Sequence, residues 1–238
     1  MHFQAKKDDI AFGLFFTNPR QIRLSNYRKD SENTFPLIGI ERLRINSDGP
    51  GVRALIAVHS CPLSCKYCIN PTSANDSGSW DVYTPEEVSD IVKSDAIYYR
   101  STNGGITFGG GEPMLRAEFI REFRKLCGSL WKIRLETSLC ANVDVLSQLV
   151  SVVDEWIIDI KSMDDDVYFS YTGITSIPRN ICLQYIVEHN LQDRCLIRIP
   201  LIPDYTTQAD QQRDKEILEE MGFTRFDLFN YKIPKRHE

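Results

Sequence analysis

The stretch HSCPLSCKYCIN, from His59 to Asn70, places three cysteines at the spacing C-x3-C-x2-C. It follows the apolar run VRALIAV at residues 52–58, whose composition is that of a buried strand. Soft thiolate ligands select zinc, copper(I) or iron–sulfur clusters. Cys61, Cys65 and Cys68 therefore predict a metal centre directly after a strand.

The number of cysteines narrows the kind of metal centre. A closed structural zinc site needs four protein ligands, and no second C-x-x-C or H-x3-H pair follows in the sequence. His59 could be a fourth ligand, although only one residue separates it from Cys61. A four-iron cluster held by three cysteines would instead leave one iron open for an exchangeable ligand. The residues favour the cluster, and zinc or coincidental buried thiols remain as alternatives.

The composition is that of an ordinary globular protein. Of the 238 residues, 42% are hydrophobic and 26% charged, and the net charge is −5. No apolar run approaches the roughly 18 residues of a membrane helix, and the basic residues are too scattered for a nucleic-acid interface. The first residues, MHFQAKKDDIAFGLFF, lack the layout of a secretory signal. We expect a cytoplasmic protein with reduced thiols that binds neither membrane nor nucleic acid.

Strand-like and helix-like segments alternate from residue 52 onward. One helix is predicted to begin at Pro85, with Thr84 as its N-cap and Glu87 completing a capping box. Such alternation implies parallel strands with right-handed crossovers, in an open doubly wound sheet or in a full or partial barrel. The six predicted strands are 52–58, 104–110, 132–138, 155–161, 195–202 and 226–232.

No linker or repeat interrupts this pattern, so we expect one core domain. It covers residues 46–238 and includes the turn DGPG at residues 48–51, and an N-terminal extension covers residues 1–45. A second predicted helix lies in LRAEFIREFRKLC at residues 115–127. Its apolar residues at roughly helical spacing are Leu115, Phe119, Phe123 and Leu126.

The segment GGITFGGGEP places Gly110, Gly111 and Glu112 at the carboxyl end of a predicted strand. Sites in α/β folds lie at this end, and glycines there let a ligand approach the backbone. The segment has neither the Walker spacing nor the pattern G-x-G-x-x-G, so it is no phosphate loop. On its own it could also be a tight turn between strand and helix.

Three successive predicted strands carry charged residues at alternating positions. Arg134 and Glu136 share one face, Asp159 and Lys161 share another, and Arg198 faces away from its apolar neighbours. Charges inside strands are costly unless they are paired or used. We expect a polar mouth that could hold a zwitterionic ligand, with a structural network of ion pairs as the alternative.

The run CPLSCKYC, with an aromatic residue before its last cysteine, resembles the signature of radical S-adenosylmethionine (SAM) enzymes. The order DGPGVR, CPLSCKYCINP, GGITFGGGEPMLRAEF, LETS and IIDIK is similar to the activating enzymes of glycyl radical enzymes, over residues 46 to 232. The resemblance implies an α/β fold, a partial (β/α)6 radical SAM barrel. It also implies a [4Fe-4S] cluster on the three cysteines that cleaves SAM, so that a hydrogen is abstracted from a glycine of a partner protein.

The resemblance also implies which residues bind SAM. Tyr67 would lie near the adenine, Gly110, Gly111 and Glu112 at the methionyl amine, and Asp159 with Lys161 along the SAM-binding strand. Glu136 and Ser138 stand where the family usually has an Asp-Thr-Asn run, and Lys232 stands where it usually has a histidine that contacts SAM. Arg198 completes this set. On the substrate side the resemblance implies Asp48, whose turn DGPG is expected near the cluster, and Arg53.

Three functions follow from these features. The first is activation of a glycyl radical enzyme, with a flavodoxin-type or ferredoxin-type reductant and a protein or peptide substrate. The second is a radical SAM enzyme that acts directly on a peptide or a small metabolite, because Lys232 alters the rim of the barrel. The third is a zinc-binding or cluster-binding module without SAM chemistry.

Overall fold

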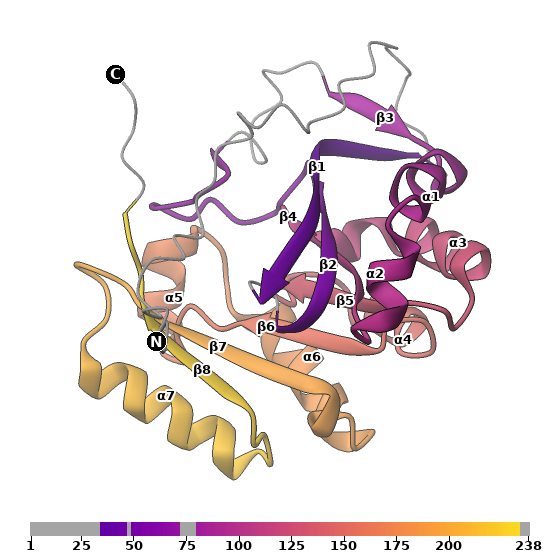
Figure 1. The fold of residues 1–238 in the computed structure, drawn as a ribbon. Coiled ribbons are helices and arrows are strands. Elements are labelled where there is room, and N and C mark those ends of the chain that lie inside the picture. Colours follow the sequence, from indigo (N-terminus) through magenta and orange to yellow (C-terminus); the bar gives the residue numbers. More distant parts are fainter. Residues whose placement is uncertain (1–33, 47–48, 72–79, 234–238) are drawn as a thin grey trace, which may run out of the picture.

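The computed structural model describes residues 34–46, 49–71 and 80–233 (Figure 1). Within these residues, eight strands form one sheet in the order β3-β1-β2-β4-β5-β6-β7-β8. The strands are β1 (Phe35–Asn46), β2 (Gly49–Val58), β3 (Asp81–Tyr83), β4 (Gly105–Gly110), β5 (Lys132–Thr137), β6 (Glu155–Asp159), β7 (Cys195–Leu201) and β8 (Phe226–Asn230).

The six predicted strands are all present, and neighbouring strands pair in parallel from β2 through β4, β5, β6 and β7 to β8. The sheet is strongly curved. Strands β2 and β6 are separated by two strands, a gap of roughly 14 Å in a flat sheet. Arg53 of β2 nevertheless reaches Glu155 of β6, with 3.7 Å between Nη2 and Oε2. The structure thus confirms an α/β fold with a curved, barrel-like parallel sheet.

Two antiparallel strands extend the sheet at the edge beside β2. Strand β1 pairs with β2, and β3 pairs with β1. Residues 35–46 therefore contribute a strand to the same sheet. Most of them belong to the predicted N-terminal extension, residues 1–45. The domain boundary at residue 45 stays a prediction.

Helices follow the parallel strands and cover the outer face of the sheet (Figure 1). The apolar core lies between them, where outward-facing residues such as Ile56, Phe108 and Trp156 meet the helices. The helices are α1 (Pro85–Lys93), α2 (Ala96–Ser101), α3 (Ala117–Cys127), α4 (Val143–Leu149), α5 (Asp165–Thr172), α6 (Ile177–Glu188) and α7 (Gln208–Glu220), with short 3-10 turns at η2 (Pro113–Arg116) and η3 (Gln192–Arg194).

Helix α1 begins as predicted, because Thr84 and Glu87 form a reciprocal capping box before Pro85. Helix α3 begins later than predicted, at Ala117, because the residues before it form the turn η2. The predicted apolar face is correct for Phe119 and Phe123, which are buried, and wrong for Leu115 and Leu126, which are each 45% exposed.

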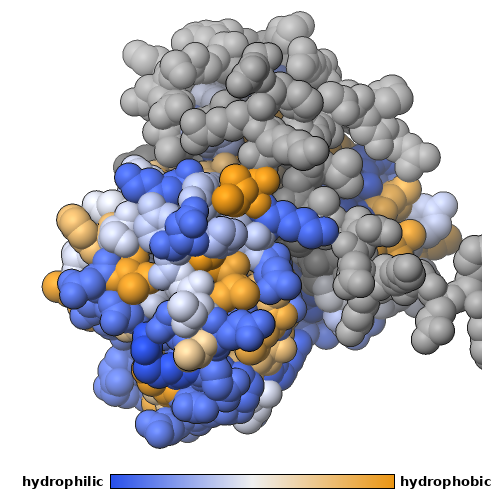
Figure 2. Space-filling model, turned by 90° about the vertical axis from the view of Figure 1, so that its left-hand side faces the viewer, coloured by the Kyte–Doolittle hydropathy of each residue, from blue (hydrophilic) through white to orange (hydrophobic). Residues whose placement is uncertain are grey.

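None of the helices in the described part of the chain is long and apolar enough to span a membrane. Figure 2 shows polar and apolar residues interspersed over the described part of one face of the molecule. Scattered apolar residues of this kind are usual on protein surfaces.

Candidate metal centre at the carboxyl ends of the strands

The loop that carries the three cysteines follows β2 and is anchored on α5. The backbone N–H of Ser64 donates to the carbonyl of Thr172 at 2.8 Å, and that of Lys66 donates to Tyr171 at 3.1 Å. These carbonyls belong to the last turn of α5, where helical carbonyls lack partners within the helix. The two residues that flank Cys65 are therefore fixed by the end of one helix.

Cys61, Cys65 and Cys68 are free thiols and partly buried. Burial raises the pKa of Cys61 to about 12 and that of Cys65 to about 11. Both thiols are neutral at pH 7 without metal, and a metal must displace their protons to bind. Three thiolates on one loop are a donor set that fits an iron–sulfur cluster.

A single zinc ion and an iron–sulfur cluster place different demands on the positions of the cysteines. Among the described residues, no three histidine, cysteine or acidic side chains converge on one point that could hold a metal ion. A cubane cluster makes no such demand, because each cysteine binds a different iron. His59, the alternative fourth ligand, is buried with its ring 4.2 Å from that of Trp80.

The glycine-rich turn after β4 packs directly on the cysteine loop. The N–H of Gly111 donates to Val58 at 2.9 Å, and the N–H of Glu112 donates to Ser60 at 2.8 Å. A Cβ atom at Gly111 would lie 2.2 Å from the carbonyl oxygen of Ser60. Gly111 is thus required for contact between the two loops, and Gly110, with φ of +94°, for the shape of the turn.

Glu112 is 1% exposed, and its carboxylate accepts four hydrogen bonds. Oε1 accepts from Thr137 Oγ1 at 2.6 Å and from the N–H of Met114 at 3.2 Å, and Oε2 accepts from the hydroxyl and N–H of Ser138 at 2.7 and 3.0 Å. Burial raises its pKa, although these bonds oppose the shift. Its four acceptor positions are filled by the protein, so Glu112 joins the ends of β4 and β5. Contact with a SAM amine stays a prediction.

A positive charge lies beside the cysteine loop at the end of β6. Lys161 Nζ is 2.5 Å from Asp159 Oδ2. Burial alone would lower the pKa of Lys161, but the nearby groups of Asp159, Cys65 and Tyr171 raise it. Lys161 therefore stays charged and would offset the negative charge of metal-bound thiolates.

The predicted charged residues inside the barrel form two sets of ion pairs, which lie at different positions along the strands. Nearer the carboxyl ends, Arg198 Nη1 bonds Glu136 Oε1 at 2.8 Å, and Arg198 Nε lies 3.3 Å from Asp227 Oδ2. Nearer the amino ends, Arg134 Nε bonds Glu155 at 2.8 Å, and Arg53 also faces Glu155.

The structure does not bring Arg53 to the cysteine loop. Arg53 pairs in register with Gly105, at the amino end of β4, whereas the cysteine loop follows Val58 at the carboxyl end of β2. Gly49, in the predicted DGPG turn, also lies at the amino end of β2, where a Cβ would meet Arg134 Nη1 at 2.4 Å. Asp48 lies outside the described residues.

Tyr67, the predicted adenine-side residue of the cysteine loop, is contacted by three tyrosines that were not predicted: Tyr171, Tyr205 and Tyr231. The hydroxyl of Tyr67 donates to Asp204 at 2.7 Å, and its ring centroid lies 5.9 Å from Tyr205 and 6.2 Å from Tyr171. Tyr231 donates to the carbonyl of Tyr67. The sequence offered one signal for them: Tyr205 follows the predicted strand 195–202, Tyr231 lies at the end of the predicted strand 226–232, and Tyr171 follows the strand 155–161. Lys232 is exposed just beyond the end of β8.

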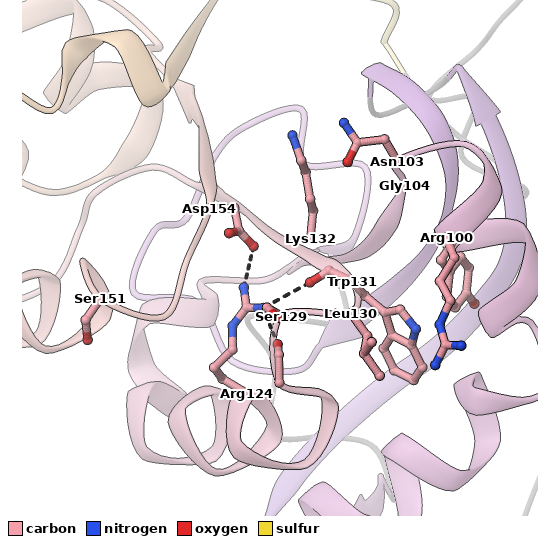
Figure 3. A pocket seen from close by; sticks show the side chains of 12 residues that line it. Arg100, Asn103, Gly104, Arg124, Ser129, Leu130, Trp131, Lys132, Ser151 and Asp154 are labelled. Carbon is pink, nitrogen blue, oxygen red and sulfur yellow. Dashed lines mark hydrogen bonds and ion pairs between the residues drawn. The ribbon is translucent and has the colours of Figure 1, made fainter.

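Two cavities of the described residues lie apart from the three-cysteine arrangement. One, of about 360 Å³, lies at the amino ends of β4 and β5, where Arg124 is held by Asp154 and by the carbonyls of Gly128 and Trp131 (Figure 3). It lies at the opposite end of the strands from the cysteines. The other, about 470 Å³, is largely apolar and is lined by Cys140 and by residues of α6.

Comparisons with known proteins agree with this geometry. The family model described as "Radical SAM superfamily" matches residues 55–211. The chain belongs to the radical SAM superfamily. Its cysteine loop, the turn at Gly110 and Gly111 and the paired charges of β6 all lie within the matched region.

Curated relatives of this radical SAM enzyme have related names. The 4-hydroxyphenylacetate decarboxylase activating enzyme of Clostridioides difficile strain CD196 is 26% identical, with 70% of this chain and 72% of the relative covered. The pyruvate formate-lyase 1-activating enzyme of Escherichia coli strain K12 is 28% identical, with 80% and 78% covered.

Solved structures of radical SAM enzymes share the fold. Streptococcus suis SuiB bound to the precursor peptide SuiA has a TM-score of 0.58 at 15% identity, over 77% of this chain and 42% of SuiB. Native anSMEcpe with bound AdoMet and a peptide has a TM-score of 0.57 at 14% identity, over 76% of this chain and 51% of that one. This chain therefore spans only about half the length of these structures.

Proposed function

We propose that this radical SAM enzyme is an activating enzyme that abstracts a hydrogen atom from a glycine of a partner glycyl radical enzyme. The main structural support for this proposal is the contact between the three-cysteine loop and the Gly110–Glu112 turn, at the carboxyl ends of the strands. Two relatives named as activating enzymes, at 26% and 28% identity over more than two thirds of each chain, support the choice of reaction.

Cys61, Cys65 and Cys68 would hold a [4Fe-4S] cluster, which supplies the electron for reductive cleavage of SAM when bound. The charge of Lys161 would stabilise the thiolates, and α5 would hold the loop in place. Gly110 and Gly111 would present backbone groups to SAM where no side chain can intervene. The other residues proposed to line the SAM site are Tyr67, Glu112, Glu136, Ser138, Asp159, Arg198 and Lys232.

The partners follow from this chemistry. A flavodoxin-type or ferredoxin-type protein would deliver the electron, and a protein with a glycine loop would be the substrate. The enzyme itself would be cytoplasmic. The core domain would cover residues 46–238. Asp48 and Arg53 would act on the substrate side; for Arg53 this means the amino-end half of the barrel interior, since it pairs with Glu155 there.

The test is anaerobic incubation of the iron-loaded protein with SAM, a strong reductant and each glycyl radical enzyme of the source organism. We expect 5′-deoxyadenosine together with the electron paramagnetic resonance signal of a glycyl radical. A partner in which the target glycine is replaced by alanine is the control. SAM cleavage that yields no glycyl radical on any partner, but modifies a peptide or metabolite, would overturn the proposal in favour of direct action.

A further inference from the structure

Tyr168 carries a buried hydroxyl that the protein itself does not use. The side chain is 1% exposed. Among the residues that the structure describes, its Oη has no hydrogen-bond partner. Buried polar groups are nearly always paired, and an orphan group in a folded protein points to an absent ligand or ion.

Tyr168 packs beside the cysteine loop. Tyr168 forms a small buried cluster with Leu63 and Cys140, and Cys61 and Cys65 pack against it. Tyr168 is also one turn before Thr172, on the same face of α5, and Thr172 accepts the hydrogen bond from Ser64. The helix that fixes the backbone around Cys65 thus also carries Tyr168.

The ring is held in one orientation. The guanidinium carbon of Arg179 lies 4.5 Å from the centroid of the Tyr168 ring. Arg179 is itself fixed by Asn180 at 3.0 Å and by the carbonyl of Ser162. A cation over the ring withdraws electron density and makes the phenol a better donor.

The phenol can only donate to an anionic neighbour. The Tyr168 hydroxyl, which has no partner among the described residues, has a proton to donate. Cys140, in the same buried cluster, is a free cysteine, and a thiol sulfur is only a weak acceptor. Of the two cysteines that pack against the Tyr168 cluster, Cys65 is the one whose neighbours Ser64 and Lys66 are bonded to α5. As a cluster ligand it would be a thiolate, and charged acceptors make the stronger hydrogen bonds.

We infer that Tyr168 Oη donates a hydrogen bond to the sulfur of Cys65 in the cluster-loaded protein and raises the reduction potential of the cluster. This inference rests on the proposed cluster. Hydrogen bonds to cluster sulfurs stabilise the reduced state, which carries the greater negative charge. Tyr168 is therefore a positioning residue that acts through Cys65.

The test compares Tyr168→Phe with the wild-type chain after anaerobic reconstitution. We expect unchanged iron content and an about tenfold lower ratio of reduced to oxidised cluster at a fixed ambient potential, which for one electron is a fall of ~59 mV. The metal-free variant should unfold at the same temperature as the wild type or higher, because the removed hydroxyl has no partner there.

Tyr99→Phe is the matched control. Tyr99 is also fully buried, and its hydroxyl bonds Asp95 at 3.5 Å, away from the cysteine loop. This variant should lose stability and keep the wild-type potential. Equal potentials for wild type and Tyr168→Phe at full iron content would overturn the inference. Failure of both proteins to take up iron and sulfide would instead overturn the proposed cluster, and the inference with it.

Discussion

At the scale of single residues, Glu112 shows how the structure adds to a sequence motif. The sequence motif predicts that Glu112 contacts SAM. In the structure, its carboxylate accepts hydrogen bonds from Met114, Thr137 and Ser138. Two of its partners lie 25 and 26 residues away in sequence. Glu112 therefore holds the ends of two strands together before any ligand binds.

We predict that Glu112→Gln lowers the free energy of unfolding of the metal-free protein by about 2 kcal/mol. The amide nitrogen would face a backbone N–H that cannot turn away, and a buried donor left unpaired costs about 1–3 kcal/mol. Denaturant unfolding without SAM measures the effect. Glu122→Gln, on the exposed part of α3, is the control and should change stability by less than about 0.5 kcal/mol. Wild-type stability with weakened SAM binding would show a role in ligand contact alone.

The cysteines could be predicted from the sequence because their spacing is local. Tyr168 and the bond between Tyr67 and Asp204 could not, because the partners meet only through the fold; Tyr67 and Asp204 are 137 residues apart. The phenol of Tyr168 has no local signal that separates it from an ordinary core tyrosine. Its significance depends on the missing hydrogen bond, which only coordinates reveal.

At the scale of elements, the ion pairs inside the barrel join neighbouring strands and also strands that are not neighbours. Glu155 of β6 faces Arg134 of β5 and Arg53 of β2, and the arginine side chains are 3% and 1% exposed. Burial alone would raise the pKa of Glu155, but the bonds from Arg134 and the charge of Arg53 lower it. The charged carboxylate therefore stabilises the curvature of the sheet.

We predict that Glu155→Gln costs about 2–3 kcal/mol at pH 7, near the low end for breaking a buried pair, because glutamine still accepts a hydrogen bond. Because the folded pKa is depressed, the stabilisation is present above the unfolded value of about 4.3 and is lost as the pH falls through the folded pKa. The difference between wild type and variant should therefore shrink below about pH 4.

Unfolding curves from pH 7 to pH 3 measure this. Glu219→Gln removes an exposed pair with Lys215 on α7 and should show neither the loss at pH 7 nor the narrowing at low pH. A constant difference between Glu155→Gln and wild type across this range would show that the charge of Glu155 does not stabilise the sheet.

The elements themselves were largely predictable. In the predicted strands, apolar residues that face the helices alternate with charged residues that face the barrel interior, and this alternation predicted the strands. The capping box predicted the start of α1. The face of α3 was wrong at Leu115 because this residue lies in the turn η2, before the helix begins. It was wrong at Leu126 because the buried position of the last turn is Cys127. Strand β1 was not predicted; its pairing with β2 depends on contacts across the sheet.

At the scale of the whole molecule, the two ends of the parallel strands differ in chemistry. The carboxyl ends gather the three cysteines, Lys161 and the turn at Gly110, whereas the amino ends gather the pairs of Glu155 and a separate cavity. This polarity is the general rule for α/β folds, where sites form at the carboxyl ends. The gathering of site residues at the carboxyl ends could be predicted from the order of strands and helices in the sequence. The ion pair of Arg53 with Glu155, which spans the barrel from β2 to β6, could not.

The central claim is that the loop of Cys61, Cys65 and Cys68 holds the cluster that cleaves SAM. Its most direct test is the anaerobic formation of 5′-deoxyadenosine by reconstituted, reduced protein, with iron content measured on the same samples. We predict that alanine at any one of these cysteines abolishes product, whereas Cys127→Ala, at a buried cysteine of α3, retains it. Full iron content and undiminished 5′-deoxyadenosine in any of the three variants would contradict the account.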